Sequence, residues 1–194
     1  MLRRLYDWTM SLARTPHAER ALAGISFAES SFFPIPPDVL LIPMVLAERL
    51  KWARYAAGCT LASVTGALLG YFIGAVLFEA VGRPILEFYG YMAKFEEFQE
   101  AFNRWGLLIV FVFGGLTPLP YKVITIASGL TGLSLPVFFI SSVLARGTRF
   151  FLVAGLLYWF GEPIRVFIER HLGLLFTLFM VLLIGGFVAV RYMF

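Results

Sequence analysis

Residues 28–40 read AESSFFPIPPDVL, and this stretch decides how the chain folds. It lies in the middle of an otherwise apolar segment, Ala21–Ala47, and it places three prolines within four residues. Proline removes a backbone donor and breaks a helix. The segment therefore consists of two arms of roughly 12 residues, whereas a membrane-spanning helix needs about 20. Two short arms joined at a proline tip predict a re-entrant hairpin, which enters and leaves a bilayer on the same side.

The overall composition also points to a membrane protein. Of the residues, 60% are hydrophobic and 14% charged, with a mean hydropathy of +0.83, whereas soluble domains are about 45–50% apolar and about 25% charged. The net charge of +4 is interpreted as a sign of membrane topology. Nucleic-acid binding is not expected, because no basic run carries interleaved aromatic residues. We expect an all-α integral membrane protein.

A second apolar segment, Gly106–Gly132, is also broken in its middle, by the sequence TPLPYKV at residues 117–123. Pro34–Val39 aligns with Pro118–Val123 at a constant offset of 84 residues, since 118 minus 34 is 84. Each broken segment is followed by a long apolar span. Because one span separates the two predicted hairpins, they must enter from opposite faces, which predicts the inverted repeat found in many transporters.

Three full spans complete the predicted membrane fold: Tyr55–Val81, Ser134–Phe160 and Leu172–Met193. The segment Gly82–Trp105 alternates charged and aromatic residues and predicts one or two interfacial amphipathic helices. Residues 1–20 predict another interfacial helix, and they are not expected to form a cleavable signal peptide, because no early apolar stretch is present. The predicted domains are residues 1–20, a membrane domain at 21–161 with repeat halves 21–81 and 106–161, and a C-terminal part at 162–194 that holds an interfacial segment and the third span.

The first span carries Gly66, Gly70 and Gly74 at four-residue spacing, which predicts a flat face for close helix packing. The distribution of basic residues predicts a cytoplasmic N-terminus. With that orientation nine basic residues face the cytoplasm and four face outward. The nine are Arg3, Arg4, Arg14, Arg20, Arg49, Lys51, Arg54, Arg165 and Arg170, and the four are Arg83, Lys94, Arg104 and Arg191.

Five ionisable residues fall within apolar stretches and form the predicted site: Glu29, Asp38, Lys122, Arg146 and Arg149. A charge at the centre of a bilayer costs at least about 2.5–3.5 kcal/mol. We therefore expect these groups to meet one another, or water, in one cavity at mid-membrane depth. The repeat would bring the tip that bears Asp38 opposite the tip that bears Lys122. Residues at the tips are expected to support the site: Pro34, Pro36, Pro37, Thr117, Pro118, Pro120 and Tyr121.

Two interpretations of this cluster remain open. The basic groups and the broken helix ends suit an anionic phosphate, and the carboxylates suit proton coupling. Alternatively, the charges are static ion pairs that hold the hairpins together. Catalysis is not expected, because no motif for hydrolysis or phosphate transfer is present and no base is arranged beside Ser30, Ser31 or Thr117, which are interpreted as polar caps. No metal or other cofactor is expected, because His17 and His171 lie in predicted interfacial segments and Cys59 stands alone.

The stretch from Glu29 to Asp38 resembles the first signature of the DedA family, an acidic residue followed by Pro-x-Pro-Gly and a second acidic residue. Residues 117–129, TPLPYKVITIASG, and residues 142–150, SVLARGTRF, resemble the short YqaA-like branch of that family. The family shares the VTT domain with eukaryotic lipid scramblases. In its main branch the second half carries arginines, where this chain has Gly115 and Tyr121.

The resemblance implies a bacterial inner-membrane protein that moves undecaprenyl phosphate or phospholipids between leaflets, with dependence on the proton motive force. It assigns Glu29 and Asp38 to the family's essential acidic pair, while Lys122, Arg146 and Arg149 supply the positive charge. The expected partners are membrane lipids with anionic head groups and protons, and a homo-oligomer is left open. The alternatives are a proton-coupled carrier of ions or small solutes and a membrane organiser that transports nothing.

Overall fold

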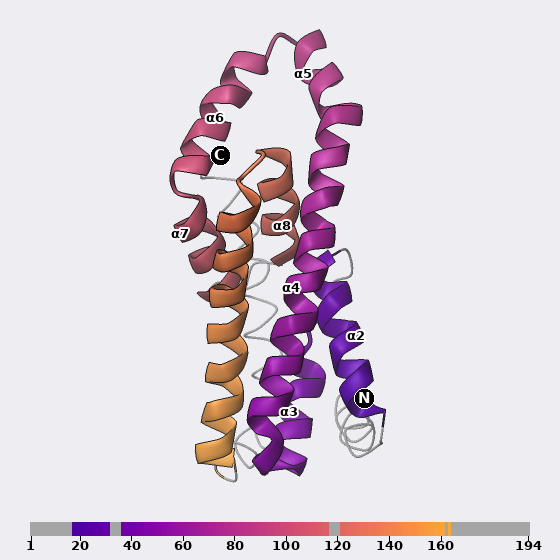
Figure 1. Ribbon diagram of the computed structural model, residues 1–194, viewed down its shortest axis with the longest axis vertical. Helices are drawn as coiled ribbons and strands as arrows, with labels where there is room; N and C mark the ends of the chain where they lie inside the picture. The colour runs from indigo at the N-terminus through magenta and orange to yellow at the C-terminus, as the bar shows by residue number, and fades with distance from the viewer. Residues whose placement is uncertain (1–16, 32–35, 117–120, 162, 164–194) are drawn as a thin grey trace.

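A computed structural model of the protein describes residues 17–31, 36–116, 121–161 and 163. The regular structure of these residues is entirely helical, with no strand among them. Figure 1 shows most of the helices running along one long axis, with α5 and α6 meeting at one end. In chain order they are α2 (Ala18–Ser31), α3 (Asp38–Ala47), a short 3-10 turn (Arg49–Lys51), α4 (Trp52–Leu77), a π-helical turn (Phe78–Gly82), α5 (Arg83–Phe88), α6 (Met92–Arg104), α7 (Gly106–Phe111), a second π-helical turn (Val112–Leu116), α8 (Tyr121–Leu130) and a long helix Leu135–Gly161.

The first apolar segment is broken where the prolines predict it. Helix α2 ends at Ser31, and α3 begins at Asp38 directly after Pro37. At 14 and 10 residues, the two helices are about 21 and 15 Å long, shorter than the roughly 30 Å hydrocarbon core of a bilayer. Pro34 lies outside the described residues, so the shape of the tip is not described.

The second broken segment has the same order of elements. Helix α7 passes into a π-helical turn that ends at Leu116, and α8 begins at Tyr121. Residues 117–120, with Thr117, Pro118 and Pro120, lie outside the described part of the chain. Each half therefore has two short helical segments followed by a long helix. Re-entrant entry into a bilayer and inversion of one half relative to the other stay predictions.

The first long helix extends further than the sequence predicts. The helix is continuous from Arg49 to Phe88, 40 residues, although Gly82 was expected to begin a separate interfacial helix. The π-helical turn before Pro84 accommodates the proline, whose missing N–H cannot continue the α-helical hydrogen bonding. The chain reverses only after α5, at Gly90, where φ is +70°.

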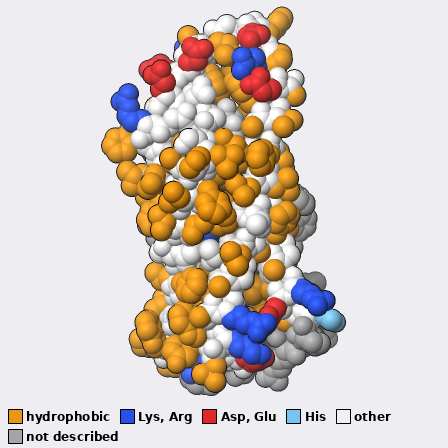
Figure 2. All heavy atoms as spheres, in the orientation of Figure 1, with side chains coloured by type: hydrophobic (Ala, Val, Ile, Leu, Met, Phe, Trp, Pro, Cys, Tyr) orange, Lys and Arg blue, Asp and Glu red, His pale blue; other side chains and the backbone are white. Residues whose placement is uncertain are grey.

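The second long helix, Leu135–Gly161, closely matches its predicted bounds. It carries Arg146 and Arg149 and is called the arginine helix below. Both long helices are long and apolar enough to cross a membrane. The predicted third span, Leu172–Met193, and the N-terminal amphipathic segment lie outside the described residues. Figure 2 shows hydrophobic side chains over the middle of the molecule and charged side chains gathered toward both ends, as expected of a surface that faces lipid.

Glycines on α4 allow the short helices to approach its backbone closely. A Cβ atom at Gly66 would overlap the carbonyl group of Phe27 on α2. One at Gly74 would overlap the carbonyl of Ile126 on α8, and one at Gly70 would overlap the side chain of Thr125. The predicted packing face therefore lies against both α2 and α8, so α4 contacts one short helix from each half of the chain.

Two apolar cores lie along the molecule. The first joins α2, α3, the start of α4 and the end of the arginine helix around Leu41, Cys59 and Phe150. The second joins the middle of α4, α6, α7, α8 and the start of the arginine helix around Ala67 and Phe138. Both long helices pass from one core to the other.

Candidate functional site

The predicted charges gather where the two long helices pass between the apolar cores. Arg146 lies 11 residues from Leu135 and 15 from Gly161, so it is roughly 16 and 22 Å from the ends of the arginine helix. Ser63 lies 11 residues after the start of α4. These residues are therefore close to the middle of α4 and of the arginine helix, and we call their cluster the polar layer. Its members are Glu29, Ser30, Asp38, Ser63, Tyr121, Ser142, Arg146 and Arg149.

The first ion pair of the polar layer joins α2 to the arginine helix. Nη2 of Arg146 donates to Oε2 of Glu29 at 2.7 Å, and the two side chains are only 3% and 12% exposed. The guanidinium carbon lies 4.7 Å from the ring centres of both Tyr121 and Phe150. Aromatic faces attract cations, so charge pairing and ring contacts both hold Arg146 in place.

The second ion pair joins α3 to the same face of the arginine helix. Nη2 of Arg149 donates to Oδ2 of Asp38 at 2.6 Å. The Arg149 side chain is 28% exposed and the Asp38 side chain 19%, so this pair is more open than the first. Asp38 is the first residue of α3, where the positive end of the helix dipole favours a carboxylate. Arg146 and Arg149 reach the two acids together because residues three apart share one helix face.

Hydroxyl groups extend the first pair into a network that reaches α4. Nε of Arg146 donates to Oγ of Ser63 at 2.7 Å, and the hydroxyls of Ser63 and Ser30 lie 2.6 Å apart. Ser30 also donates to Oε2 of Glu29 at 3.3 Å. The hydroxyl of Tyr121 donates to Ser142 at 2.6 Å. Side chains from α2, α4, α8 and the arginine helix thus converge on one buried guanidinium.

The structure brings together four of the five predicted charged residues. The fifth, Lys122, is half-buried at the start of α8, one residue after Tyr121, whose ring contacts Arg146. Its backbone carbonyl accepts a hydrogen bond from Thr125 at 2.9 Å. That the tip bearing Asp38 lies opposite the tip bearing Lys122 stays a prediction; the described partner of Asp38 is Arg149, on the helix that follows α8. That the group forms a transport site stays a prediction.

The sequence analysis missed Ser63 and gave Ser30 and Ser31 a different role. These two serines were interpreted as caps of the broken helix, but they bond across to α4, Ser30 to Ser63 and Ser31 to the carbonyl of Gly66 at 3.0 Å. Ser63 lies three residues before Gly66, on the helix face where the glycine stripe begins. That spacing indicates that Ser63 faces the neighbouring helices, but it does not indicate which group Ser63 bonds to.

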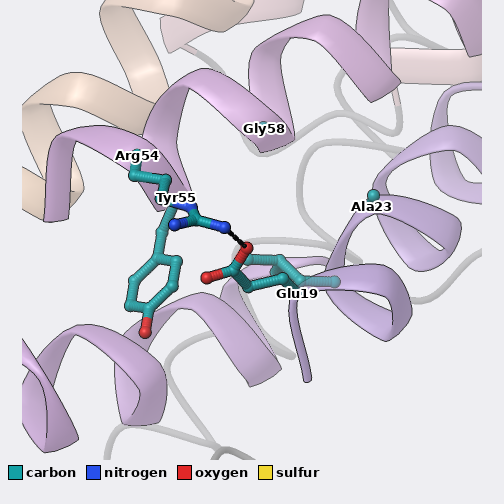
Figure 3. A pocket seen from close by; sticks show the side chains of 6 residues that line it. Glu19, Ala23, Arg54, Tyr55 and Gly58 are labelled. Atoms are coloured by element: carbon teal, nitrogen blue, oxygen red, sulfur yellow. Dashed lines mark hydrogen bonds and ion pairs between the residues drawn. The ribbon is translucent and has the colours of Figure 1, made fainter. Parts of the chain in front are cut away.

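Two hollows lie away from the polar layer. One, of about 170 Å³, lies between α2 and α4, and Figure 3 shows the ion pair between Arg54 and Glu19, at 2.7 Å, joining two of the side chains that line it. Both side chains are exposed, at 70% and 38%, so water screens this pair. The other, of about 300 Å³, is bounded by α4, α5, α6 and the end of α8, and it carries Glu79, Arg83 and Glu96. Within the described residues no group of histidine, cysteine and acidic side chains is placed to hold a metal ion.

Comparisons with known proteins identify the family. The VTT domain matches residues 35–159, which is more than half of the chain. An uncharacterized protein of Haemophilus influenzae is 39% identical over 158 residues, which cover 81% of each chain. An uncharacterized protein of Histophilus somni is 34% identical over 158 residues, covering 81% of this chain and 82% of that one. No solved structure matches. The helices, the apolar surface and the matched domain agree: the chain belongs to the DedA family of membrane proteins, whose members carry the VTT domain.

Proposed function

We propose that this protein is a carrier that moves a lipid with a phosphate head group, undecaprenyl phosphate or a phospholipid, between the leaflets of the bacterial inner membrane, together with protons. The proposal rests on the two ion pairs in the polar layer, which join Glu29 to Arg146 and Asp38 to Arg149. Ionisable residues inside a membrane are rare and mark ion or substrate pathways. Under this proposal all four residues serve the passage of the lipid and of protons.

The proton coupling follows from competition for the arginines. A phosphate oxygen accepts the same charge-assisted hydrogen bonds as a carboxylate. A lipid phosphate that takes an arginine from its partner therefore leaves a carboxylate unpaired at membrane depth. An unpaired buried charge is costly, and protonation of the carboxylate removes that cost. Binding of the phosphate and binding of a proton thus favour each other.

The order of the helices supports a two-sided path. In the proposed topology the N-terminus is cytoplasmic, the two broken segments enter from opposite faces, and the polar layer lies between their tips. Each ion pair ties a helix of the first half to the arginine helix of the second half. Exchange of these contacts would open the layer alternately to the two sides, as in other carriers built from inverted repeats.

Reconstitution into liposomes tests the proposal. Fluorescent undecaprenyl phosphate and fluorescent phospholipid are placed in one leaflet, and their arrival in the other is measured with and without a pH gradient. We expect lipid movement that increases with the gradient and is lost in Glu29→Gln and Asp38→Asn. Glu19→Gln is the matched control, because Glu19 is an exposed acid on the same helix as Glu29.

The other outcomes favour other roles. Proton flux that depends on a soluble ion, without lipid movement, would identify a solute carrier. Loss of folded protein in both acid variants would indicate static ion pairs. Movement of neither lipid nor ion would favour a membrane organiser.

A further inference from the structure

The two ion pairs differ in how completely their polar atoms are used. Both acceptors of Arg146 are in place: Ser63 at Nε and Glu29 at Nη2, each at 2.7 Å. The rings of Tyr121 and Phe150 lie close to the same guanidinium. With 3% of its side chain exposed, Arg146 offers a ligand no approach. In this arrangement of the helices the first pair is therefore closed to a ligand and supports the second.

The second pair is incomplete. Arg149 and Asp38 meet through one contact, from Nη2 to Oδ2. Nε of Arg149 and Oδ1 of Asp38 are buried, and within the described residues neither has a hydrogen-bond partner. A buried polar atom without a partner is unfavourable, and native proteins contain few of them. One pair thus holds an unmet donor and an unmet acceptor, and its side chains are partly exposed.

We infer that the Asp38–Arg149 pair is the ligand-contacting pair and that it receives a singly protonated phosphate group. Such a group carries both a hydrogen-bond donor and a hydrogen-bond acceptor, and the two unpaired atoms require one of each. Its P–OH donates to Oδ1 of Asp38, and a charged oxygen accepts from Nε of Arg149. A phosphodiester has no P–OH and would place an oxygen against the carboxylate instead. This inference rests on the proposed function and specifies which atoms first recognise the head group, before it separates Arg149 from Asp38.

The charge of the polar layer favours the same state of the ligand. Two arginines and two carboxylates sum to zero, so every charge on the ligand is an addition to a buried, neutral group. A single charge costs less to bury than a double charge. The ionisable residues whose charges interact with the pair are Glu29 on α2, Cys59 on α4 and Arg146 on the arginine helix.

Direct binding to the purified full-length protein in detergent micelles tests the inference without transport. The probes are dodecyl phosphate, which is a monoester, methyl dodecyl phosphate, which is the matching diester, and inorganic phosphate. The second pKa of a phosphate monoester is about 6. We expect dodecyl phosphate to bind at pH 5.5 at least about tenfold more tightly than the diester, and to lose most of this preference at pH 8. The diester does not change its charge between pH 5.5 and pH 8. Any pH dependence of its binding therefore comes from groups of the protein.

Three variants separate ligand contact from structural support. Asp38→Asn presents an N–H where Oδ1 was, because Arg149 still holds the oxygen, so we expect the preference to shift from the monoester toward the diester. Arg149→Lys should weaken monoester binding about tenfold. Ser141→Ala removes a buried hydroxyl whose bond, among the described residues, stays within its own helix, to the carbonyl of Val137, and it should leave the preference unchanged.

Several results would overturn the inference: equal binding of monoester and diester to the native protein, an unchanged preference in Asp38→Asn, or monoester binding that Arg149→Lys leaves intact. If inorganic phosphate competes with dodecyl phosphate, free phosphate is a second source of the ligand. If it does not compete, the site is restricted to lipids. The proposed hydrogen-bond pattern is the same in both cases. If the preference is found but no lipid moves in liposomes, the proposed function fails and this inference stands. If lipid moves but the protein does not prefer the monoester, this inference fails and the proposed function stands.

Discussion

Replacing Gly66 by alanine should weaken the contact between α2 and α4. A Cβ atom at this position would overlap the Phe27 carbonyl oxygen and lie 2.9 Å from its carbon, and backbone atoms cannot move aside as a flexible side chain does. The helices must separate, and the hydrogen bond from Ser31 to the Gly66 carbonyl lengthens with them. Overpacking of a well-filled interior costs about 1–3 kcal/mol. We expect Gly66→Ala to lower the free energy of unfolding by that amount.

Gly58→Ala is the matched control, because Gly58 lies on the same helix and a Cβ atom there would have no neighbour within 4 Å. Alanine favours a helix over glycine by up to about 1 kcal/mol, so this variant should be as stable as the native protein or slightly more so. Unfolding of both variants by sodium dodecyl sulfate in mixed micelles, followed by circular dichroism, gives the comparison. Equal stability of the two variants would refute the close approach of α2 to α4.

Three further predictions concern residues outside the polar layer. Arg54→Ala should change the free energy of unfolding by less than about 1 kcal/mol, because its ion pair with Glu19 is exposed to water, and a thermal unfolding measurement with Glu19→Ala checks this. Cys59 has no exposed surface, so a maleimide should label it only after the protein is unfolded, and rapid labelling of the folded protein would contradict its burial. In a Cys59→Ala background, Lys51→Cys and Lys94→Cys should be labelled from opposite sides of the membrane, and labelling from one side would refute the proposed topology.

The sequence predicted the features that depend on local chemistry. The prolines at positions 36 and 37 mark the end of the first break, because proline acts on the helix in which it stands. The arginine helix was predicted nearly to its last residue from apolar length alone. The expectation that Glu29, Asp38, Arg146 and Arg149 meet followed from the cost of an isolated buried charge.

The choice of partners could not be predicted in the same way. The sequence did not indicate that Asp38 pairs with Arg149 and Glu29 with Arg146, because pairing depends on how the helices rotate and tilt against one another. Ser63 is one hydroxyl in an apolar helix, and such a hydroxyl commonly bonds to its own helix, as Thr60 does with the carbonyl of Ala56. Its role became visible only when the arginine helix brought the Nε atom of Arg146 to it.

The position of the polar layer follows from how the two cores share the long helices. Among the described helices, α4 and the arginine helix contribute to both cores, whereas α2 and α3 belong to the first and α6, α7 and α8 to the second. One turn beyond Arg146 the arginine helix presents Phe150 to the first core, and one turn beyond Ser63 helix α4 presents Ala67 to the second. A guanidinium at position 150 instead of 146, one turn or about 5.4 Å along the helix, would enter the first core and leave Glu29 without its partner. Buried charge is therefore paired at the level where the two cores meet, and helices from both halves of the chain supply the partners.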